Sequence, residues 1–373
     1  MEQQHLNRVE QVNLGSYYTK PELVQKVYDL LRKHVPDFDE YTIIDNSCGY
    51  GSFLDFDIPN KKIGADTDKA ALKKIKSDAI LIEHNSLAKI SRDDYNLSHN
   101  EKIIMIGNPP YNDTTSIIRN KIKQEQKESN AIKTRDLGMS FLLSYNFLKA
   151  DFICVLHPLS YLIKKTNFKT LSEFAENYKL LDCEIISSRE FTDKTSGTFF
   201  PIAIALYCKG EMTYNFIENY DFKAENKSFR LKDLVSVGNF ISKYPNQKFV
   251  REKDVVAKFY TMRDINALKR SKTFVETSTR NTIFVSRNDL DYYCYVDVFK
   301  KFIPHVPYYF GNCDVMIDND KFQEIKECFV LYSAQTNEIL KKHCKELENY
   351  KEKVSNYFKK LLGEHYLSQN TAL

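Results

Sequence analysis

The chain has 373 residues, of which 42% are hydrophobic and 28% charged, an ordinary balance for a globular protein long enough for two separate cores. No stretch approaches the ~18 apolar residues of a membrane span, and the polar start MEQQHLNRVEQVN lacks a secretory apolar segment. The eight cysteines never form a Cys-x-x-Cys pair, which disfavours a zinc ribbon, and their scatter disfavours a disulfide scaffold. We therefore expect a cytoplasmic protein that needs no metal.

Short apolar runs alternate with helical stretches over the first half of the chain. Helices are predicted at 20–35, 68–76 and 139–150. Strands are predicted at 41–45, 62–66, 79–83, 102–106, 152–156, 183–187 and 199–209. Such β-branched runs suit strands that are buried on both faces of a sheet. The alternation predicts an α/β fold with a doubly wound, mostly parallel sheet of seven strands.

The alternation stops after about residue 210, and tyrosine and phenylalanine become frequent. We place a domain boundary between residues 215 and 216 and predict a long charged helix at 336–362. The net charge of +4 is unevenly placed, because residues 241–280 hold ten basic and four acidic side chains. A solvated face explains such a segment as well as a partner with a phosphate backbone does.

Polar residues follow three of the predicted strands. The first strand runs into DNSCGYGSF, in which Asp45 precedes a tight Gly-x-Gly turn that lets the backbone approach a ligand. Asp66 ends the second strand, where an acid can bind both ribose hydroxyls of a nucleoside or, alternatively, cap a helix. Asn85 follows the third strand and could read the edge of an adenine ring. Together they favour a nucleoside site at one sheet edge.

The fourth strand ends in IGNPPYND, which a simple turn does not require. The side-chain oxygen of Asn108 and the carbonyl of Pro109 can accept both hydrogens of an exocyclic amino group. Two consecutive prolines hold that carbonyl rigidly, and Tyr111 offers a flat face for a base. The nitrogen lone pair is then free to attack an electrophile, without help from a metal.

These residues resemble a known family. Asn108-Pro109-Pro110-Tyr111 matches the catalytic motif of S-adenosylmethionine-dependent amino-methyltransferases, above all the DNA adenine-N6 methyltransferases. The segment GSYYTKPELVQKV resembles their N-terminal motif, and DNSCGYGSF resembles their Asp-Pro-x-Cys-Gly-x-Gly-x-Phe loop. REFTDKTSGTFFPIAIALY resembles the region whose phenylalanine stacks on the target base. The likeness covers about residues 13–210, in the motif order of the gamma arrangement.

The resemblance implies a Rossmann-like catalytic domain at 1–215, a target-recognition domain at 216–373, and individual residue roles. The catalytic residues would be Asn108, Pro109, Pro110 and Tyr111. The residues that contact S-adenosylmethionine would be Tyr18, Thr19, Pro21, Asp45, Ser47, Cys48, Gly49, Gly51, Phe53, Asp66, Thr67, Asn85 and Asn108. A flipped base would stack on Tyr111 and on Phe191 or, as second choice, Phe199. The predicted contacts to the DNA backbone are Lys248, Arg251, Arg263, Lys269, Arg270 and Lys272.

The implied activity is site-specific methyl transfer to adenine N6 in duplex DNA, as the modification component of a restriction–modification system with a cognate endonuclease as candidate partner. Two positions depart from the family, since Asn46 replaces its usual proline and Asn85 its usual acid. Cytosine N4 is a close rival substrate, although that group usually has Ser in place of Asn108. RNA adenine, protein glutamine and a non-catalytic DNA-binding protein with the same fold are further alternatives.

Overall fold

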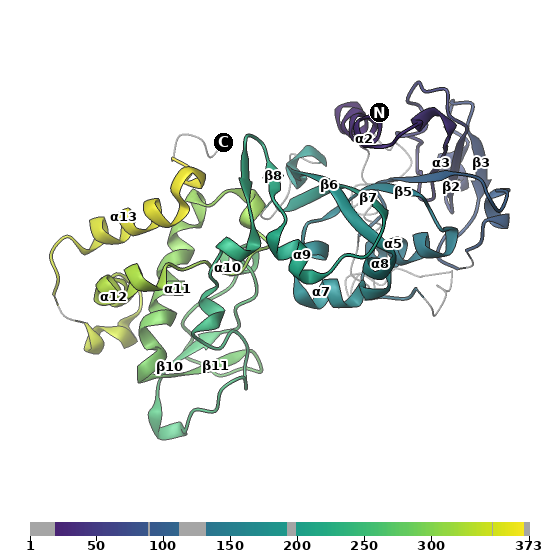
Figure 1. Cartoon of the computed structure of the whole chain (residues 1–373). Helices are drawn as coiled ribbons and strands as arrows, with labels where there is room; N and C mark the ends of the chain where they lie inside the picture. The colour runs from purple at the N-terminus through teal and green to yellow at the C-terminus, as the bar shows by residue number, and fades with distance from the viewer. Residues whose placement is uncertain (1–18, 89, 112–131, 192–198, 345, 369–373) are drawn as a thin grey trace. The chain divides into compact units, whose positions relative to one another are not determined.

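The computed structural model describes residues 19–88, 90–111, 132–191, 199–344 and 346–368 (Figure 1). The chain divides into two compact units, the first formed by Met1–Lys194 and Pro201–Ser228 and the second by Thr195–Phe200 and Phe229–Leu373. The division after Ser228 lies 228 − 215 = 13 residues beyond the predicted boundary. The reason is that residues 222–224 pair with the first unit's sheet.

A nine-stranded sheet forms the centre of the first unit, in the order β3-β2-β1-β4-β5-β7-β6-β8-β9. Its strands are β1 (Thr42–Asp45), β2 (Lys62–Asp66), β3 (Ile80–Glu83), β4 (Ile103–Gly107), β5 (Phe152–Pro158), β6 (Tyr178–Ser187), β7 (Pro201–Lys209), β8 (Phe222–Ala224) and β9 (Lys227–Phe229). β1 to β5 pair in parallel, whereas β7 runs antiparallel between β5 and β6. The predicted Rossmann-like α/β fold is confirmed, and β8 with β9 makes the sheet larger than expected.

The register of β1 and β4 places the beginnings of the loops that follow these two strands side by side. Ile44 lies opposite Met105 and Asp45 opposite Ile106, so both strands end at the same edge of the sheet. All residues of both strands are buried, as their β-branched, apolar sequences predict. The strand order reverses between β1 and β4, and doubly wound sheets bind ligands in the crevice at such a point.

Helices cover the sheet of the first unit. They are α2 (Pro21–His34), α3 (Lys69–Leu72), α5 (Leu137–Leu148), α6 (Ser160–Ile163), α7 (Lys165–Thr170), α8 (Ser172–Asn177) and α9 (Tyr214–Asn219). Figure 1 shows α2 on one side of the sheet and α5 with α8 on the other. The helix predicted at 68–76 is shorter, because the chain leaves α3 after Leu72 and Ile75 packs against Gly51.

The second unit packs helices beside a two-stranded sheet. Its elements are β10 (Val255–Tyr260), β11 (Thr282–Ser286), α10 (Ile265–Arg270), α11 (Leu290–Phe302), α12 (Asn319–Ala334) and α13 (Tyr350–Leu362). The core is aromatic, with Tyr295 of α11 against Phe329 of α12 and Tyr357 of α13 at ring-centroid distances of 5.0 and 5.8 Å. The frequent aromatic residues of this half thus form its core.

The single helix predicted at 336–362 is wrong in its first half. A 3-10 helix spans Glu338–His343, and α13 begins only after Asn349. Asn349 has a φ of 54°, in the left-handed region that asparagine tolerates better than most residues but that a continuous helix excludes. In the part of the chain that the structure describes, no helix combines the length and apolar character needed to cross a bilayer.

Candidate active site

Asn108 is held at the carboxyl edge of the sheet, directly after β4. Its Nδ2 donates a hydrogen bond to Oγ1 of Thr19, 3.3 Å away, and Thr19 is 3% exposed. Its Oδ1 is shielded from solvent and has no hydrogen-bond partner among the described residues. A buried acceptor without a partner costs free energy, and a bound ligand is one way in which such a group is satisfied.

The backbone on either side of Asn108 is tightly constrained. Gly107 has a φ of +142°, and a Cβ there would lie 2.8 Å from Oδ1 of Asp45, so only glycine lets β4 end this close to β1. Pro109 and Pro110 then fix φ for two residues and carry no donor. The acceptor oxygens of Asn108 and Pro109 are therefore presented by a rigid backbone.

Asp45 is buried beneath the glycine loop. Its side chain is 1% exposed, and Oδ1 accepts a hydrogen bond from the backbone N of Ser47 at 3.1 Å. Burial raises the pKa of Asp45 to about 8; the Ser47 bond opposes the shift, and the nearby Asp66 adds to it. At neutral pH this carboxyl group is therefore mostly protonated and stabilises the loop without a full charge.

Asp66 organises the same loop from the end of β2. Its Oδ2 accepts from the backbone N of Gly49 at 2.7 Å, and its Oδ1 accepts from the backbone N of Asp68 at 2.9 Å. Asp68, not Asp66, caps α3. Each carboxylate oxygen has a second lone pair, so Asp66 can hold the turn and still accept from a ligand hydroxyl.

Two predicted cofactor residues, Cys48 and Phe53, have side chains that are buried under the loop surface. The side chains of Cys48 and Phe53 are 6% and 2% exposed, and Cys48 packs with Leu54 and Leu72. Burial raises the pKa of the Cys48 thiol above its usual range, so this cysteine is a packing residue without a thiolate role. Their placement supports the loop geometry and not a direct ligand contact.

The remaining predicted cofactor residues vary in their placement. Oδ1 of Asn85 accepts from the backbone N of Leu87 at 3.0 Å, so only its second lone pair remains for a ligand. Pro21 occupies the first turn of α2, Thr67 is exposed, and Tyr18 lies outside the described residues. Ser47 is the most suggestive, because its Oγ is buried and without a hydrogen-bond partner among the described residues.

Of the two phenylalanines proposed to stack on a base, only Phe191 belongs to the unit that carries Asn108. It ends a 3-10 helix, Ser188–Phe191, that follows β6. The neighbouring Glu190 lies 3.6 Å from Lys20, next to Thr19. Phe199 belongs to the second unit, where its carbonyl accepts from Asn266. Phe191 remains the first choice.

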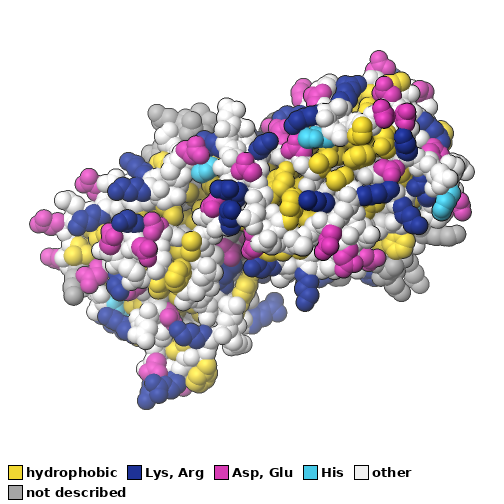
Figure 2. All heavy atoms as spheres, in the orientation of Figure 1, with side chains coloured by type: hydrophobic (Ala, Val, Ile, Leu, Met, Phe, Trp, Pro, Cys, Tyr) yellow, Lys and Arg dark blue, Asp and Glu magenta, His cyan; other side chains and the backbone are white. Residues whose placement is uncertain are grey.

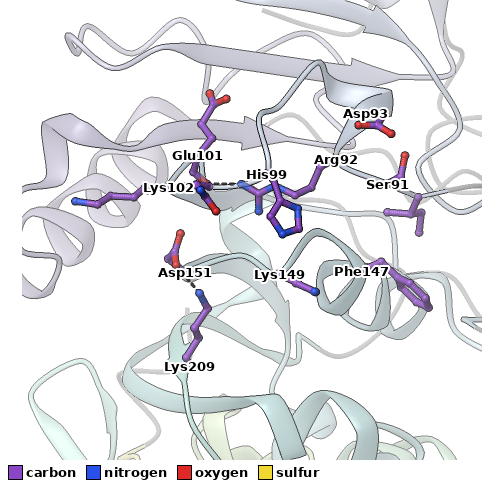
Figure 3. Close-up of a pocket in the computed structure, with 12 residues that line it drawn as sticks. Ser91, Arg92, Asp93, His99, Glu101, Lys102, Phe147, Lys149, Asp151 and Lys209 are labelled. Atoms are coloured by element: carbon purple, nitrogen blue, oxygen red, sulfur yellow. Dashed lines mark hydrogen bonds and ion pairs between the residues drawn. The ribbon is translucent and has the colours of Figure 1, made fainter.

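A separate cavity of about 520 Å³ lies at the opposite edge of the same sheet (Figure 3). Its lining includes Lys102, which precedes β4, and Asp151, which precedes β5. Two of the basic side chains around it have structural partners: Lys209 pairs with Asp151 at 2.5 Å, and Arg92 donates to the carbonyl of Leu148 at 2.8 Å. This cavity has no part in the chemistry considered below.

The structure separates the predicted DNA contacts of the second unit into two groups. Lys248 and Arg251 form ion pairs, with Asp289 at 2.8 Å and with Asp254 at 2.6 Å. Figure 2 shows basic and acidic side chains interspersed on the visible face. The exposed members with neither an ion pair nor a side-chain hydrogen bond to another described residue are Arg263, Lys269 and Lys272. Arg270 and Lys272 line a cavity of about 720 Å³ together with Tyr260 and Phe274.

No protein-family model matches the chain, and no curated protein matches it. Similar solved structures include a candidate class I S-adenosylmethionine-dependent methyltransferase from Listeria monocytogenes (15% identity, 58% of this chain and 68% of the other, TM-score 0.41). The M protein of the type I restriction enzyme EcoKI is 13% identical over 74% of this chain and 64% of its own, with a TM-score of 0.40.

The restriction–modification enzyme MmeI, solved with DNA, is 12% identical over 72% of this chain, with a TM-score of 0.41. This chain spans only 47% of the MmeI chain. These similar structures are thus a candidate class I S-adenosylmethionine-dependent methyltransferase and two proteins of restriction–modification systems. Because the identities are so low, the geometry of the site, and not these relatives, supports the proposal that follows.

The sequence did not predict the partner of the Asn108 amide. The family resemblance assigns Thr19 to the cofactor, but its described hydrogen bond orients Asn108, 89 residues later in the chain. No local sequence pattern predicts this contact, because it depends on how the start of α2 packs near the end of β4. Within the described residues, no group of three His, Cys, Asp or Glu side chains is arranged to bind a metal ion.

Proposed function

We propose that this chain is a site-specific DNA methyltransferase that acts on N6 of an adenine flipped out of duplex DNA, with S-adenosylmethionine as methyl donor. We further propose that it serves as the modification component of a restriction–modification system, with a cognate endonuclease as partner. The observation that carries the proposal is the buried, unpartnered Oδ1 of Asn108, oriented by Thr19 beside two prolines.

Asn108 and Pro109 would act on the amino group of the target base. Oδ1 of Asn108 and the carbonyl of Pro109 would accept its two hydrogens, which raises the electron density on the nitrogen and leaves its lone pair pointing away from both acceptors. The nitrogen would form its bond to the methyl carbon as the cofactor's sulfur leaves, and would then release one of its two protons. The acceptors are held in place before the reaction and need no reorganisation, the condition under which electrostatic stabilisation is most effective. Tyr111 and Phe191 would stack on the flipped ring and offset part of the cost of unstacking it.

The loop after β1 and the end of β2 fit S-adenosylmethionine. This cofactor supplies an electrophilic methyl group when bound. A Cβ at Gly49 would meet no atom within 4 Å, so the loop has open space there, and the buried, unpartnered Oγ of Ser47 is a candidate contact for a polar ligand. Asp66 would bind the ribose hydroxyls through its second lone pairs while it holds the backbone N of Gly49.

The decisive experiment gives the purified chain S-adenosylmethionine and duplex DNA and analyses the digested nucleosides by mass spectrometry. N6-methyladenine is the expected product. N4-methylcytosine, methylated RNA or methylated protein glutamine as the preferred product would replace the proposed substrate with that alternative. Failure to bind S-adenosylmethionine in calorimetry would favour a non-catalytic DNA-binding protein. Modified-base sequencing of DNA from expressing cells gives the recognition site and shows whether one or both strands are modified.

Asp66→Ala is expected to weaken S-adenosylmethionine binding by roughly ten- to a hundredfold, because bonds to ribose and to the turn at Gly49 are removed together. Calorimetry on the variant without DNA measures this directly. Asp68→Ala is the matched control, since it removes the cap that accepts from Ala70 and Ala71 and leaves the Asp66 side chain in place. Equal dissociation constants for the wild type and Asp66→Ala would limit Asp66 to a structural role.

Replacing the three unpaired cations, Arg263, Lys269 and Lys272, by alanine is expected to reduce the slope of log affinity for duplex DNA against log salt. The slope should fall by about one unit for every phosphate that the variant no longer neutralises. Lys248→Ala with Arg251→Ala is the matched control, and should change the slope less because both side chains have acidic partners. Duplex titrations between low and moderate salt provide the measurement. Equal slopes for wild type and the triple variant would remove these side chains from the DNA interface.

A further inference from the structure

The first turn of α5 packs directly against Tyr111. A Cβ at Gly138 would lie 3.0 Å from Cβ of Tyr111 and 2.5 Å from Oη of Tyr161. Real Cβ atoms do not come within 2.5 Å of a neighbouring atom, so any larger residue at position 138 must displace Tyr161, and at 3.0 Å it also crowds Tyr111. Glycine is therefore the only residue type at this position that leaves both tyrosines in place.

Asp136 forms hydrogen bonds to both Gly138 and Tyr161. Its Oδ1 accepts from the backbone N of Gly138 at 3.0 Å, as the N-cap of α5, and also accepts from the hydroxyl of Tyr161. The backbone of Asp136 is itself held by Thr134, whose Oγ1 donates to the Asp136 carbonyl at 2.6 Å. One carboxylate oxygen thus joins the start of α5 to the Tyr161 hydroxyl.

Tyr161 packs against a residue of the central sheet. It is 2% exposed, and its ring stacks on that of His157 at the end of β5, with centroids 5.3 Å apart and an interplanar angle of 10°. Burial lowers the pKa of His157 to about 4, so the imidazole is neutral at pH 7. Its Nδ1 donates to the carbonyl of Pro158 at 3.0 Å, which leaves Nε2 to accept from the Tyr207 hydroxyl at 2.7 Å.

We propose that Asp136, Gly138 and Tyr161 form a rigid seat that positions Tyr111. None of the three is required to touch substrate; each acts through the placement of the Tyr111 ring. The seat joins Tyr111 to β5 and β7 through packed and hydrogen-bonded groups, so the position from which the ring extends is set before a base arrives. This inference rests on the proposed function for its consequence, base stacking, but not for the geometry itself.

Gly138→Ala and Tyr161→Phe test the seat in two ways. The alanine favours the helix more than glycine does but displaces Tyr161 and crowds Tyr111, so kcat for DNA methylation is expected to fall ten- to a hundredfold, the scale of a misplacement of about 1 Å. Tyr161→Phe keeps the ring stack and removes only the hydroxyl, with an expected loss of roughly two- to tenfold. S-adenosylmethionine affinity should be unchanged in both, since the cofactor loop is untouched.

Tyr178→Phe is the matched control for removal of a buried hydroxyl. Tyr178 is 2% exposed, and its hydroxyl donates to the carbonyl of Ala150 at 3.1 Å, at the opposite edge of the sheet. The control should lower stability about as much as Tyr161→Phe does and leave kcat unchanged. A general packing defect would instead lower kcat in both tyrosine variants alike.

A double-mutant cycle with Tyr111→Ala decides whether the seat acts through Tyr111. Once the ring is removed, Gly138→Ala should cause little further loss of kcat, because its target is gone. A full additional loss in the Tyr111→Ala background would overturn the proposal. So would a wild-type kcat in both Gly138→Ala and Tyr161→Phe.

Fluorine NMR of protein labelled with 3-fluorotyrosine tests the same geometry without any substrate. The Tyr111 resonance is assigned by its loss in Tyr111→Phe. It should shift in Gly138→Ala and Tyr161→Phe and stay in place in Tyr178→Phe, and an unmoved resonance in the first two variants would overturn the seat. If the wild type fails to methylate DNA, the proposed function fails, and this measurement still decides the geometry.

Discussion

Asn108→Ala is expected to lower kcat for adenine methylation by 10² to 10³, a loss of ~3–4 kcal/mol in transition-state stabilisation, while S-adenosylmethionine binding stays within a few fold of normal. The substitution removes an acceptor that the fold keeps buried and without a partner among the described residues. Its hydrogen bond would strengthen as positive charge develops on the amino nitrogen, so the loss should appear in kcat rather than in KM. Single-turnover methylation of a duplex measures it.

Two further variants separate the loss of the acceptor from damage to the fold. Thr19→Val removes the hydroxyl that orients the Asn108 amide and should cost roughly tenfold in kcat, because the acceptor remains but is less well directed. Asn60→Ala removes a different buried amide, which donates to the carbonyls of Phe38 and Tyr41 at 2.8 and 2.9 Å. It should lower stability and leave kcat alone. Near-normal turnover in Asn108→Ala would refute the proposed chemistry.

The parallel core could be predicted from sequence because its signals are local. Runs such as Ile103–Gly107 are apolar and β-branched at most positions, which few structures other than a doubly covered strand accommodate. The glycines and prolines at the strand ends then mark where the chain must turn. These signals, together with the right-handed chirality of parallel crossovers, restrict where each strand can lie in the sheet.

The details that decide chemistry were less visible, because they depend on contacts between distant segments. Thr19 and Asn108 are 89 residues apart in the sequence. The seat formed by Asp136, Gly138 and Tyr161 matches no sequence motif. Charge counting likewise could not show that Lys248 and Arg251 have acidic partners while Lys269 does not. Composition gives the number of cations in a segment, but folding determines which of them remain available.

Asp45 supplies the second large expected effect, a fall in the stability of the first unit as the pH rises. Burial raises its pKa to about 8, whereas an unfolded aspartate titrates near ~3.9. Between these values the unfolded chain has released the proton and the folded chain still holds it. Stability therefore declines with increasing pH across this window, by up to ~5.6 kcal/mol in total.

Asp45→Asn should flatten this decline, because asparagine keeps an acceptor for the backbone N of Ser47 and does not ionise. Asp182→Asn is the matched control, because the contribution of Asp182 to stability changes with pH in the opposite direction. Although burial opposes it, hydrogen bonds from His34 and Lys33 hold the pKa of Asp182 below its usual value, so its contribution is present at neutral pH and disappears on acidification. Asp182→Asn should therefore remove stability at pH 7 and little at pH 3.

Hydrogen exchange of peptides from β1 and β4, measured in urea at several pH values, reports the first unit alone and avoids assuming a single transition for both units. The quantity to compare is the slope of the opening free energy against pH between about 4 and 8, which is insensitive to any constant cost of burying the new amide. If wild type and Asp45→Asn share one slope, Asp45 is ionised within the folded protein. The end of β1 would then carry a full negative charge beside Gly107.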